Sequence, residues 1–487
     1  MPQDGSIPST IERYVTGGNP SMLIDGAFVL AASGETFDTL NPATQQLLAR
    51  LPAADATDVD RAVVAARRAF DDGPWSTMKP FDRQRIMLRF ADLVEARHDD
   101  LAILDTLDMG APIQRMRANL RRAVGMARFY AGLTTALRGE TIANSIPGDF
   151  QTHTRREPVG VVGAIIPWNN PHIAFIWKVG AALAAGCTVV LKPAEEASLS
   201  ALWLGEMLLE AGLPAGVVNV VTGFGETAGV ALSVHPGVDK IAFTGSTEVG
   251  RLIQQRLGER GTHLTLELGG KGANIVFEDA PIDEMVEGVI DGIFFNQGHV
   301  CCAGSRLLVQ ESIADEVVRR VLRRVEQLRV GDPLDKNTDV GAINSAAQLA
   351  RIEELTEAGE AEGATRHTST CALPNEGYWF APTVFTDVAQ SHRIAREEIF
   401  GPVLSVLTFR TPEEAVAKAN NTTYGLACGV WSEKGSRTLW VAQRLRAGVI
   451  WANTYNRFDP TSPFGGMRES GFGREGGRHG LEAYLDV

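Results

Sequence analysis

The chain alternates short apolar runs with segments of helical spacing, and this pattern starts at Val159. The runs at residues 159–166 and 187–191 predict buried strands, and residues 173–185 between them predict a helix that Gly186 ends. The pattern continues with a helix-length segment at 198–211 and strand-length runs at 217–221, 240–243 and 264–268. Strands joined by helices pair in parallel through right-handed crossovers, so the alternation predicts an α/β protein built on a parallel sheet.

A second alternation begins beyond Gly270. Apolar residues at helical spacing predict a helix over 313–325, and the runs at 426–431 and 449–451 predict strands of a second α/β domain. A chain of 487 residues is too long for one ordinary core, which agrees with two or three domains. Other predicted elements are amphipathic helices beside the first sheet at 59–70 and 83–98, and a protruding strand pair within 132–153.

Charge and cysteine usage exclude several classes of protein. A net charge of −13 leaves no concentration of Lys and Arg for a nucleic acid or an anionic membrane. Residues 1–6 lack the features of a secretory signal, and the longest apolar run, 179–191, is too short to span a bilayer. The 5 cysteines include no C-x-x-C pair, and no HExxH or P-loop motif occurs, so neither a disulfide framework nor a metal site is predicted. We therefore expect a cytoplasmic protein in a reducing setting.

Two adjacent thiols, Cys301 and Cys302, lie in a turn bracketed by Gly298 and Gly304, and Glu267 precedes them in the chain. A thiolate that attacks a carbonyl and a carboxylate that activates water are the two halves of covalent catalysis. The thiol needs a lowered pKa or a nearby base, and helix N-terminal amides are one source of the former. A buried cysteine is more often a packing residue, but the flanking glycines favour close approach of a ligand. The pair could also form an inhibitory disulfide.

Two glycine-rich turns are candidate phosphate sites. The turn at 245–250 follows a predicted strand and opens a helix, so its amides and the Ser246 hydroxyl could hold a phosphate, and 223–229 has a similar composition. Neither matches the strict G-x-G-x-x-G fingerprint, and each equally fits an ordinary strand-to-helix turn. Lys192 and Glu195, at the end of another strand, could share ribose hydroxyls or form a surface ion pair.

Asn169 lies between two prolines at the end of a predicted strand. A rigidly held primary amide is suited to donate a hydrogen bond to an oxyanion, although an asparagine here also fits ordinary turn chemistry. The order of motifs is more specific than any one of them. They are P-W-N, K-P-x-E, G-S-T-x-x-G, E-L-G-G-K, G-x-x-C-x-A-G-S-R, E-E-I-F-G-P and S-P-F-G-G. This succession is similar to that of the NAD(P)-dependent aldehyde dehydrogenase superfamily over nearly the whole chain.

The resemblance implies a Rossmann-like parallel-sheet cofactor domain, a second α/β catalytic domain and a small β oligomerisation element. The expected boundaries are 1–131 with 154–269 for NAD binding, 270–468 for the catalytic domain that holds the nucleophilic cysteine, and 132–153 with 469–487 for oligomerisation. The chain's ending resembles the family's subunit-pairing tail, so a homodimer or homotetramer is expected.

The resemblance also implies roles for individual residues. Cys301 would be the nucleophile, and Asn169 with the backbone amide of Cys301 would form the oxyanion hole. Glu267 would activate the hydrolytic water, and Lys178 would assist proton movement. An aldehyde would pass through a thiohemiacetal and a thioester to the carboxylic acid, with a hydride transferred to the nicotinamide. Glu267 would act efficiently only if partial burial raised its pKa toward neutrality.

For the cofactor, the resemblance places Lys192 and Glu195 on the adenosine ribose, Ser246 on a phosphate and Glu398 on the nicotinamide ribose. The charge of Glu195 should repel a 2′-phosphate, so NAD is expected rather than NADP. Gln348 is a weaker candidate for a ribose contact. The other expected cofactor contacts are Ile165, Pro167, Trp168, Gly225, Gly229, Phe243, Gly245, Leu268 and Phe400. The expected tunnel residues for the aldehyde are Asn170, Ala174, Trp177, Phe295, Arg457, Phe458 and Phe464.

Some positions depart from the family pattern. His299 stands where relatives have Gln or Glu, and we interpret it as a tolerated surface substitution, although it could make activity sensitive to pH. Asn170 and His172 replace apolar residues at the tunnel mouth, and with Arg457 and Asp459 they indicate a polar or acidic aldehyde. Three other functions are compatible with the same motifs: a cysteine hydrolase of activated esters, a CoA-acylating dehydrogenase, and a silent binding protein on the same fold.

Overall fold

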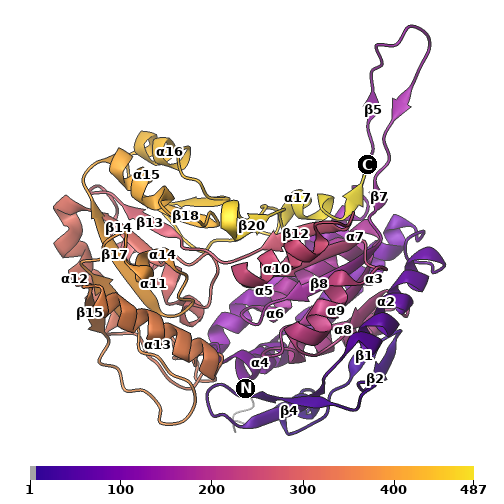
Figure 1. Ribbon diagram of the computed structural model, residues 1–487, viewed down its shortest axis with the longest axis horizontal. Coiled ribbons are helices and arrows are strands. Elements are labelled where there is room, and N and C mark those ends of the chain that lie inside the picture. The colour runs from indigo at the N-terminus through magenta and orange to yellow at the C-terminus, as the bar shows by residue number, and fades with distance from the viewer. Residues whose placement is uncertain (1–6) are drawn as a thin grey trace.

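Two sheets covered by helices form the framework of the chain, whose structure we describe for residues 7–487 from a computed structural model (Figure 1). The first sheet has eight strands and the second has seven. Most neighbouring strands in both are parallel and are connected through helices, so the predicted α/β class is confirmed. Residues 1–6, which were compared with a secretory signal, lie outside the described residues.

The first sheet has a parallel centre with antiparallel edges. Its central strands are buried along their whole length, which explains why they occur in the sequence as unbroken apolar runs. In spatial order the strands are β2 (Ala27–Val29), β1 (Met22–Ile24), β10 (Val218–Val220), β9 (Thr188–Pro193), β8 (Val161–Ile166), β11 (Lys240–Thr244), β12 (His263–Glu267) and β20 (Gly471–Phe472). The last strand comes from the C-terminal segment and pairs antiparallel with β12.

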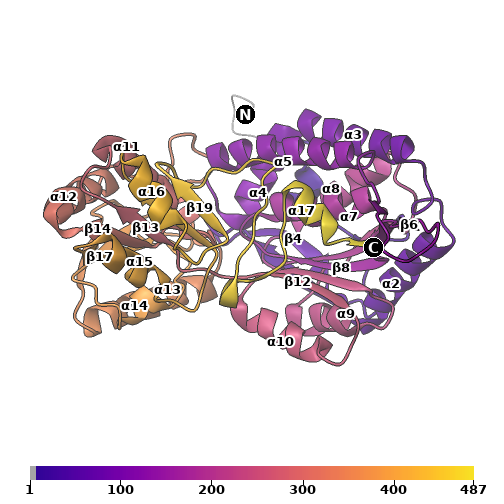
Figure 2. The same cartoon turned by 90° about the horizontal axis from the view of Figure 1, so that it is seen from above.

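Helices cover both faces of this sheet (Figure 2). One face packs against α2 (Ala56–Asp71), α9 (Val230–Val234) and α10 (Thr247–Leu257). The opposite face packs against α3 (Pro80–Ala96), α4 (His98–Met109), α5 (Ile113–Leu133) and α8 (Leu199–Glu210). Smaller N-terminal elements are α1 (Glu12–Val15), β3 (Thr36–Leu40) and β4 (Leu47–Pro52).

The second sheet repeats this layering. Its strands are, in spatial order, β15 (Thr365–Thr368), β16 (Thr383–Thr386), β17 (Val403–Phe409), β14 (Arg306–Gln310), β13 (Ala273–Val276), β18 (Ala427–Trp431) and β19 (Val449–Ala452). One face is covered by α11 (Ile282–Ile293) and α12 (Ala314–Val325). The other is covered by α13 (Ala346–Ala361), α14 (Arg393–Arg396), α15 (Pro412–Asn420) and α16 (Gly435–Ala442).

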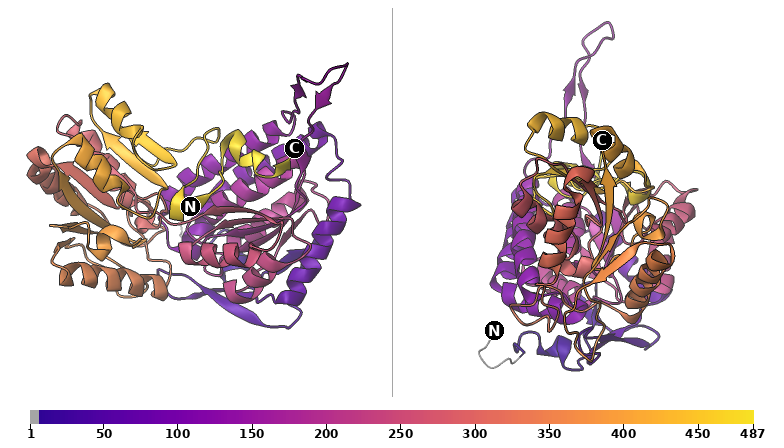
Figure 3. Two further views of the ribbon diagram at one scale, coloured as in Figure 1. Left: turned by 45° about the horizontal axis from the view of Figure 1, so that its top comes forward. Right: turned by 90° about the vertical axis from the view of Figure 1, so that its left-hand side faces the viewer.

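A hairpin of β5 (Thr141–Ile142) and β6 (Thr152–His153) projects from the molecule near the C-terminus (Figures 1 and 3). The predicted protruding strand pair is therefore confirmed, although its strands are only two residues long and α5 occupies residues up to Leu133. At the base of the hairpin, β7 (Glu157–Pro158) pairs with β21 (Leu485–Asp486), which follows α17 (Gly477–Glu482). Within residues 7–487, no helix combines the length and apolar character needed to cross a membrane.

The helix predicted at 173–185 is present but interrupted. It consists of α6 (Pro171–Phe175), the π-helical turn η1 (Ile176–Gly180) and α7 (Ala181–Ala185). Gly186 ends it with φ of 100°, in the left-handed conformation that favours glycine at this position. The π-turn inserts an extra residue, a feature frequent at functional sites, and it contains Lys178.

Candidate active site

Cys301 lies in a tightly wound turn between α11 and β14. The preceding turn η3 (Phe295–Gly298) contains three successive residues in the left-handed region, Asn296, Gln297 and Gly298, with φ of 52°, 56° and 75°. A Cβ on Gly298 would clash with the backbone carbonyl of Gly401. The glycine is therefore required for packing against the protein itself, which corrects the interpretation that it makes room for a ligand.

The Cys301 side chain lines an internal cavity of about 340 Å³. Asn169, from the loop that follows β8, lines the same cavity, as does Thr244 at the end of β11. The Thr244 hydroxyl has no hydrogen-bond partner among the described residues. The two sheets therefore contribute a thiol and an amide to one enclosed space, the minimum arrangement for attack on a bound carbonyl.

The Asn169 amide is oriented by the turn that contains the thiol. Its Nδ2 donates to the carbonyl of His299 at 2.8 Å, and Asn296 Nδ2 donates back to the Asn169 carbonyl at 3.1 Å. A primary amide has two N–H groups, so a second donor remains for an oxyanion in the cavity. The Asn169 side chain is therefore already held in place before a substrate binds.

The Cys301 thiol is protonated in this arrangement. Its hydrogen bond with Cys302, followed by burial, raises the pKa of Cys301 well above its usual range. Cys301 follows η3 and precedes β14, so it does not itself begin a helix. A base must therefore remove the thiol proton during the reaction.

Glu267 is a candidate for that base, because its carboxyl interacts with Cys301. It is the last residue of β12, it is 4% exposed, and neither carboxyl oxygen has a hydrogen-bond partner among the described residues. Burial, and then the charge of Glu475, raises the pKa of Glu267 well above its usual range, and Cys301 raises it further. Glu267 itself does not line the cavity; it lies against Gly465, where a Cβ would approach its Oε1 to 2.5 Å.

Lys178 and Glu475 form a buried ion pair beside Glu267. The Lys178 ammonium contacts Oε1 of Glu475, and their side chains are 1% and 8% exposed. Glu475 also lines the cavity. The sequence analysis did not assign Glu475 a role; the signal was its place before Gly476 and Gly477, both with positive φ, which turn the chain sharply beside it.

The carboxyl edge of the first sheet holds the residues expected to bind the adenosine end of a cofactor. Lys192, at the end of β9, donates from Nζ to Oε2 of Glu195 at 2.6 Å, and Glu195 Oε1 accepts from the Gly225 amide at 3.4 Å. A Cβ on Gly225 would meet nothing within 4 Å, so there is open space beside this pair. Gly225 and Gly229 bound the π-helical turn η2 (Gly225–Gly229).

The next expected contact is the start of α10. Ser246 caps this helix by accepting from the Val249 amide at 3.2 Å, and the capped N-terminus opens at the same edge of the sheet. The nearby apolar residues are mainly packing groups. Phe243 is 5% exposed and a Cβ on Gly245 would lie 2.5 Å from its ring, while Leu268 packs against Gly250 and Ile165 lies within β8.

The Glu398 carboxyl lies against the Gly269-Gly270 backbone. Its Oε1 accepts from the Gly270 amide at 2.9 Å, and a Cβ on Gly269 would clash with its Oε2. Only glycine at 269 permits this position of the carboxyl. Burial raises the pKa of Glu398 to about 7, while the Gly270 amide and then the charge of Lys271 oppose the shift.

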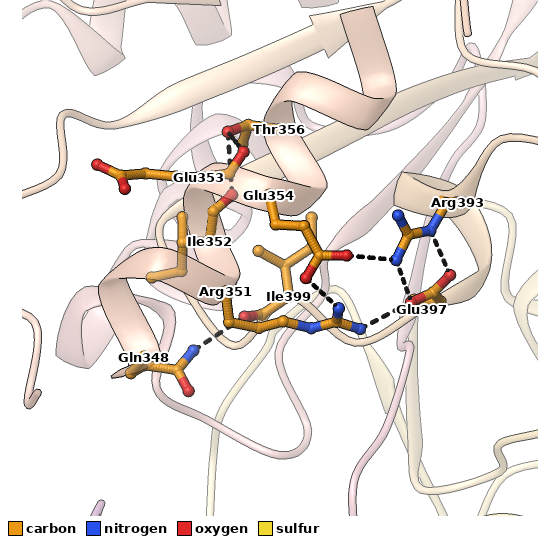
Figure 4. A network of polar contacts seen from close by, with 9 residues as sticks. All are labelled: Gln348, Arg351, Ile352, Glu353, Glu354, Thr356, Arg393, Glu397 and Ile399. Atoms are coloured by element: carbon orange, nitrogen blue, oxygen red, sulfur yellow. Dashed lines mark hydrogen bonds and ion pairs between the residues drawn. The ribbon is translucent and has the colours of Figure 1, made fainter. Parts of the chain in front are cut away.

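Gln348 holds the backbone that follows Glu398 through two hydrogen bonds. Its Nε2 donates to the carbonyls of Ile399 at 3.1 Å and Phe400 at 3.0 Å, so in this structure it holds the loop instead of reaching a ribose. Figure 4 shows the ion-pair network that fixes the same segment: Arg351 and Arg393 each bind both Glu354 and Glu397.

His299 is fully buried, so its interpretation as a surface substitution is wrong. Its ring meets Trp168 edge-on at 4.8 Å and stacks on Phe400 at 5.8 Å between centroids. Neither ring nitrogen has a hydrogen-bond partner among the described residues. Burial lowers the pKa of His299 to about 3, so the ring is neutral at physiological pH.

Every residue expected in the aldehyde tunnel lines the cavity: Asn170, Ala174, Trp177, Phe295, Arg457, Phe458 and Phe464. Asp459 lines it too, as does Pro167 from the expected cofactor set. His172 does not; it is fully buried and contacts Asp105 through Nδ1, which corrects its expected place at the mouth. The sequence analysis missed Asn119, Arg122 and Met126, which α5 presents to the cavity, because it did not predict that helix.

Fold and site together define an α/β protein with a cysteine and an asparagine side chain at one cavity between helix-covered sheets. Residues 28–487 match the model of the aldehyde dehydrogenase family. The chain is 48% identical over 482 residues to a protein of Bacillus subtilis named "Putative aldehyde dehydrogenase DhaS", covering 99% of this chain and 97% of that protein. The NAD+ complex of aldehyde dehydrogenase from Bacillus cereus superposes with a TM-score of 0.96 at 44% identity, covering 99% and 98%.

The NAD-dependent aldehyde dehydrogenase from Sinorhizobium meliloti gives a TM-score of 0.95 at 42% identity, covering 99% of this chain and 96% of that one. The chain therefore belongs to the aldehyde dehydrogenase family. This confirms the family predicted from the sequence and, with it, an enzyme that oxidises an aldehyde to a carboxylic acid with NAD.

Proposed function

We propose that this chain oxidises its aldehyde through a covalent bond to Cys301, with Glu267 as the base and Asn169 as the oxyanion donor. The observation that supports this assignment most strongly is that Cys301 and Asn169 line one cavity while Glu267 lies beside it without a partner. A buried carboxyl without hydrogen bonds is expensive to maintain, and a role in proton transfer accounts for it.

The first step joins Cys301 to the substrate. Glu267 takes the thiol proton, the sulfur attacks the aldehyde carbon, and the carbonyl oxygen becomes an oxyanion. The free N–H of the Asn169 amide and the Cys301 backbone amide stabilise that oxyanion, and the thiohemiacetal results. Because the Asn169 side chain is already held by His299, little ordering is needed in the transition state.

The residues at the sheet edge fit NAD. Lys192 and Glu195 offer a donor and an acceptor next to open space, and α10 offers a capped helix N-terminus to a phosphate. Glu398 would hold the nicotinamide ribose, with Gln348 acting on it through the 399–400 backbone. When bound, NAD accepts the hydride that leaves the thiohemiacetal, which becomes a thioester on Cys301. Trp168 and Phe400 would border the same cleft.

Hydrolysis completes the cycle. Glu267 first gives up the proton that it took from the thiol, and Glu475 and Lys178, which lie next to it, would take that proton onward. Glu267 then removes a proton from water as the water attacks the thioester carbonyl, and this proton passes to the Cys301 sulfur as the carboxylic acid leaves. The carboxylate of Glu267 favours water over CoA as the acceptor of the acyl group. A cysteine hydrolase without a cofactor would have no use for the proposed NAD-binding residues at the edge of the first sheet.

Aldehyde-dependent formation of NADH tests this proposal. A panel of aldehydes with NAD should give NADH and an equal amount of acid without CoA. Glu267→Gln should retain at most a burst of NADH. At high pH another base can remove the Cys301 proton, so the thioester still forms, but its hydrolysis stalls without the Glu267 carboxylate. A full steady-state rate in Glu267→Gln, or a requirement for CoA, would contradict the assignment.

We further propose the division expected from the sequence: 1–131 with 154–269 as the NAD-binding domain, 270–468 as the catalytic domain, and 132–153 with 469–487 as the oligomerisation element. The exposed Ile142, Ile146 and Phe150 on the hairpin support its pairing with a second copy in a dimer or tetramer. The 5 cysteines, all free thiols, support a reducing, cytoplasmic setting. Light scattering that finds only monomer would contradict the oligomer.

A further inference from the structure

Two arginines that line the cavity form no ion pair within residues 7–487. Arg122, from α5, lines the cavity and is half-buried, and within residues 7–487 it forms no ion pair. Its Nη2 donates to Oδ1 of Asn119 at 3.0 Å, and its guanidinium lies 5.5 Å from the centre of the Phe458 ring. Arg457 lines the same cavity, and its side chain has neither a hydrogen bond nor an ion pair in the described chain.

The carboxylates nearby already have partners. Asp291 pairs with Arg115 at 3.2 Å, and Arg115 in turn lies over the Phe295 ring. Asp459 accepts from both the amide and the hydroxyl of Thr461. Burial lowers the pKa of Arg122; Asp291 opposes this shift, and the charge of Arg457 adds to it. Both guanidinium groups therefore line the same cavity, near enough for the charge of Arg457 to act on Arg122; Arg457 is exposed, and neither group forms an ion pair within residues 7–487.

From these contacts we propose that the enzyme selects an aldehyde that carries a carboxylate at its far end, and that Arg122 and Arg457 bind this carboxylate. The inference rests on the proposed function, because it assigns the substrate class of the same cavity. The planar fork of a guanidinium matches a carboxylate in a bidentate manner. In a protein with a net charge of −13, such a ligand needs a local excess of positive charge to enter.

The remaining walls define the rest of the substrate. Arg122 lies against Phe458, Phe458 contacts Phe464, and Phe464 stacks on Trp177, and all of these side chains line the cavity, so the body that joins carboxylate and aldehyde is expected to be apolar. Trp177 and Phe464 stack face to face, with 5.4 Å between their ring centres and 11° between their planes, which gives this wall a flat surface. A ligand with a carboxylate at one end, an uncharged aldehyde at the other and an apolar middle is complementary to these side chains.

Arg122 is also connected to the reacting end. Asn119 accepts from Arg122 and donates from its Nδ2 to Oδ1 of Asn170 at 2.9 Å, and Asn170 precedes α6 directly after Asn169. A carboxylate bound by Arg122 therefore acts on a chain of hydrogen bonds that ends beside the proposed oxyanion donor. We expect its contribution to appear mainly in kcat/KM.

The test compares ω-oxo carboxylic acids, from succinic semialdehyde upward in chain length, with their methyl esters, following NADH. For the best chain length, the acid should exceed its ester in kcat/KM by on the order of tenfold to a hundredfold, the range for a hydrogen bond to a charged group. Arg122→Gln and Arg457→Gln should each lower this acid-to-ester ratio by about tenfold. Arg121→Gln, an exposed neighbour on α5 outside the cavity, is the matched control and should leave the ratio unchanged.

A binding measurement makes the test independent of turnover and of folding defects. Titration of the full-length enzyme with the corresponding dicarboxylic acid, monitored by calorimetry, should give weaker binding in both variants, while their melting temperatures show that they fold. Equal kcat/KM for acids and esters at every chain length, or unchanged dicarboxylate binding in the variants, would overturn the inference. If esters and acids alike gave no NADH while the variants lost dicarboxylate binding, the proposed function would fail and the carboxylate site would stand.

Discussion

The ammonium of Lys178 contacts the carboxylate of Glu475 in the interior, next to the unpartnered carboxyl of Glu267. The two members of this pair act in opposite directions on their neighbour: Glu475 raises the pKa of Glu267, and Lys178 lowers it. The pKa of Glu267, the proposed base, therefore depends on two opposing charges, and a single substitution that removes one of them should shift this pKa up or down.

Lys178→Met should raise the pKa of Glu267, and Glu475→Gln should lower it. Because Glu267 works as a base only when ionised, the pH dependence of thioester hydrolysis should move to higher pH in the first variant and to lower pH in the second. Rapid-quench measurement of acid release across pH would show this. Both variants should also lose about 3–5 kcal/mol of stability, because each leaves one buried charge alone. Shifts in the same direction would contradict the proposed balance.

Cys301→Ala should abolish aldehyde oxidation and leave NAD binding within about twofold, since the thiol forms the covalent bond and no part of the sheet-edge site. Cys302→Ala should keep activity within about tenfold, because Cys302 is 2% exposed and points its thiol at Asn456. Cys302→Ala should also lower the pKa of Cys301, because the hydrogen bond with Cys302 raises that pKa in the wild type. The pH dependence of alkylation by iodoacetamide would report this shift, and loss of activity in Cys302→Ala alone would reverse the assignment.

His299 should weaken the fold in acid. The folded ring has a pKa of about 3, below that of the unfolded chain near 6.5, so between these values the unfolded state binds the extra proton. Stability is therefore complete above pH ~6.5 and falls by about 1.4 kcal/mol per pH unit below it. The difference in unfolding free energy between wild type and His299→Gln should change by about this amount from pH 7.5 to 5.5.

The exposed His479→Gln is the matched control and should show no such change. A pH-independent difference for His299→Gln would mean that the ring accepts a proton in the folded state. The activity profile itself should not follow His299, because the ring stays neutral over the working range.

Glu195→Gln should raise the efficiency with NADP relative to NAD by on the order of tenfold, because removing the carboxylate removes repulsion of a 2′-phosphate. Lys192 would then be free to bind that phosphate, since its present partner is Glu195. Steady-state kcat/KM with both cofactors measures the ratio. Glu284→Gln, on the exposed face of α11, controls for overall charge, and equal use of both cofactors by the wild type would contradict the premise.

The alternating pattern predicted the central strands of the first sheet, because strands buried on both faces must be apolar throughout, but in the second sheet it predicted only β18 and the edge strand β19. It did not predict α4 or α5. The first of these is buried along most of its length and has little amphipathic contrast, and the second has Arg and Asn residues that face the cavity rather than solvent. The π-helical turn η1 could not be predicted either, since its inserted residue changes the backbone hydrogen bonding without changing the composition.

At the site, the thiol, the carboxyl and the amide could be predicted from their motifs, because few other residue types can fill their chemical roles. His299 was not, because its burial depends on Trp168 and Phe400, which come from distant parts of the chain. Glu475 was missed for the same reason, since its ion pair joins residues 297 positions apart. The excess charge at Arg122 became apparent only once the helix placed it beside Arg457.

Gly269 sets a limit on redesign of this enzyme. Because even a methyl group there would clash with the Glu398 carboxyl, alanine at this position displaces either the loop or the carboxyl. Libraries that aim to broaden the choice of cofactor analogues should therefore vary the adenosine side of the cleft and keep this glycine invariant. Any variant that tolerates a larger residue at 269 will have moved the Glu398 carboxyl or the backbone beside it, and with it the proposed contact to the nicotinamide ribose.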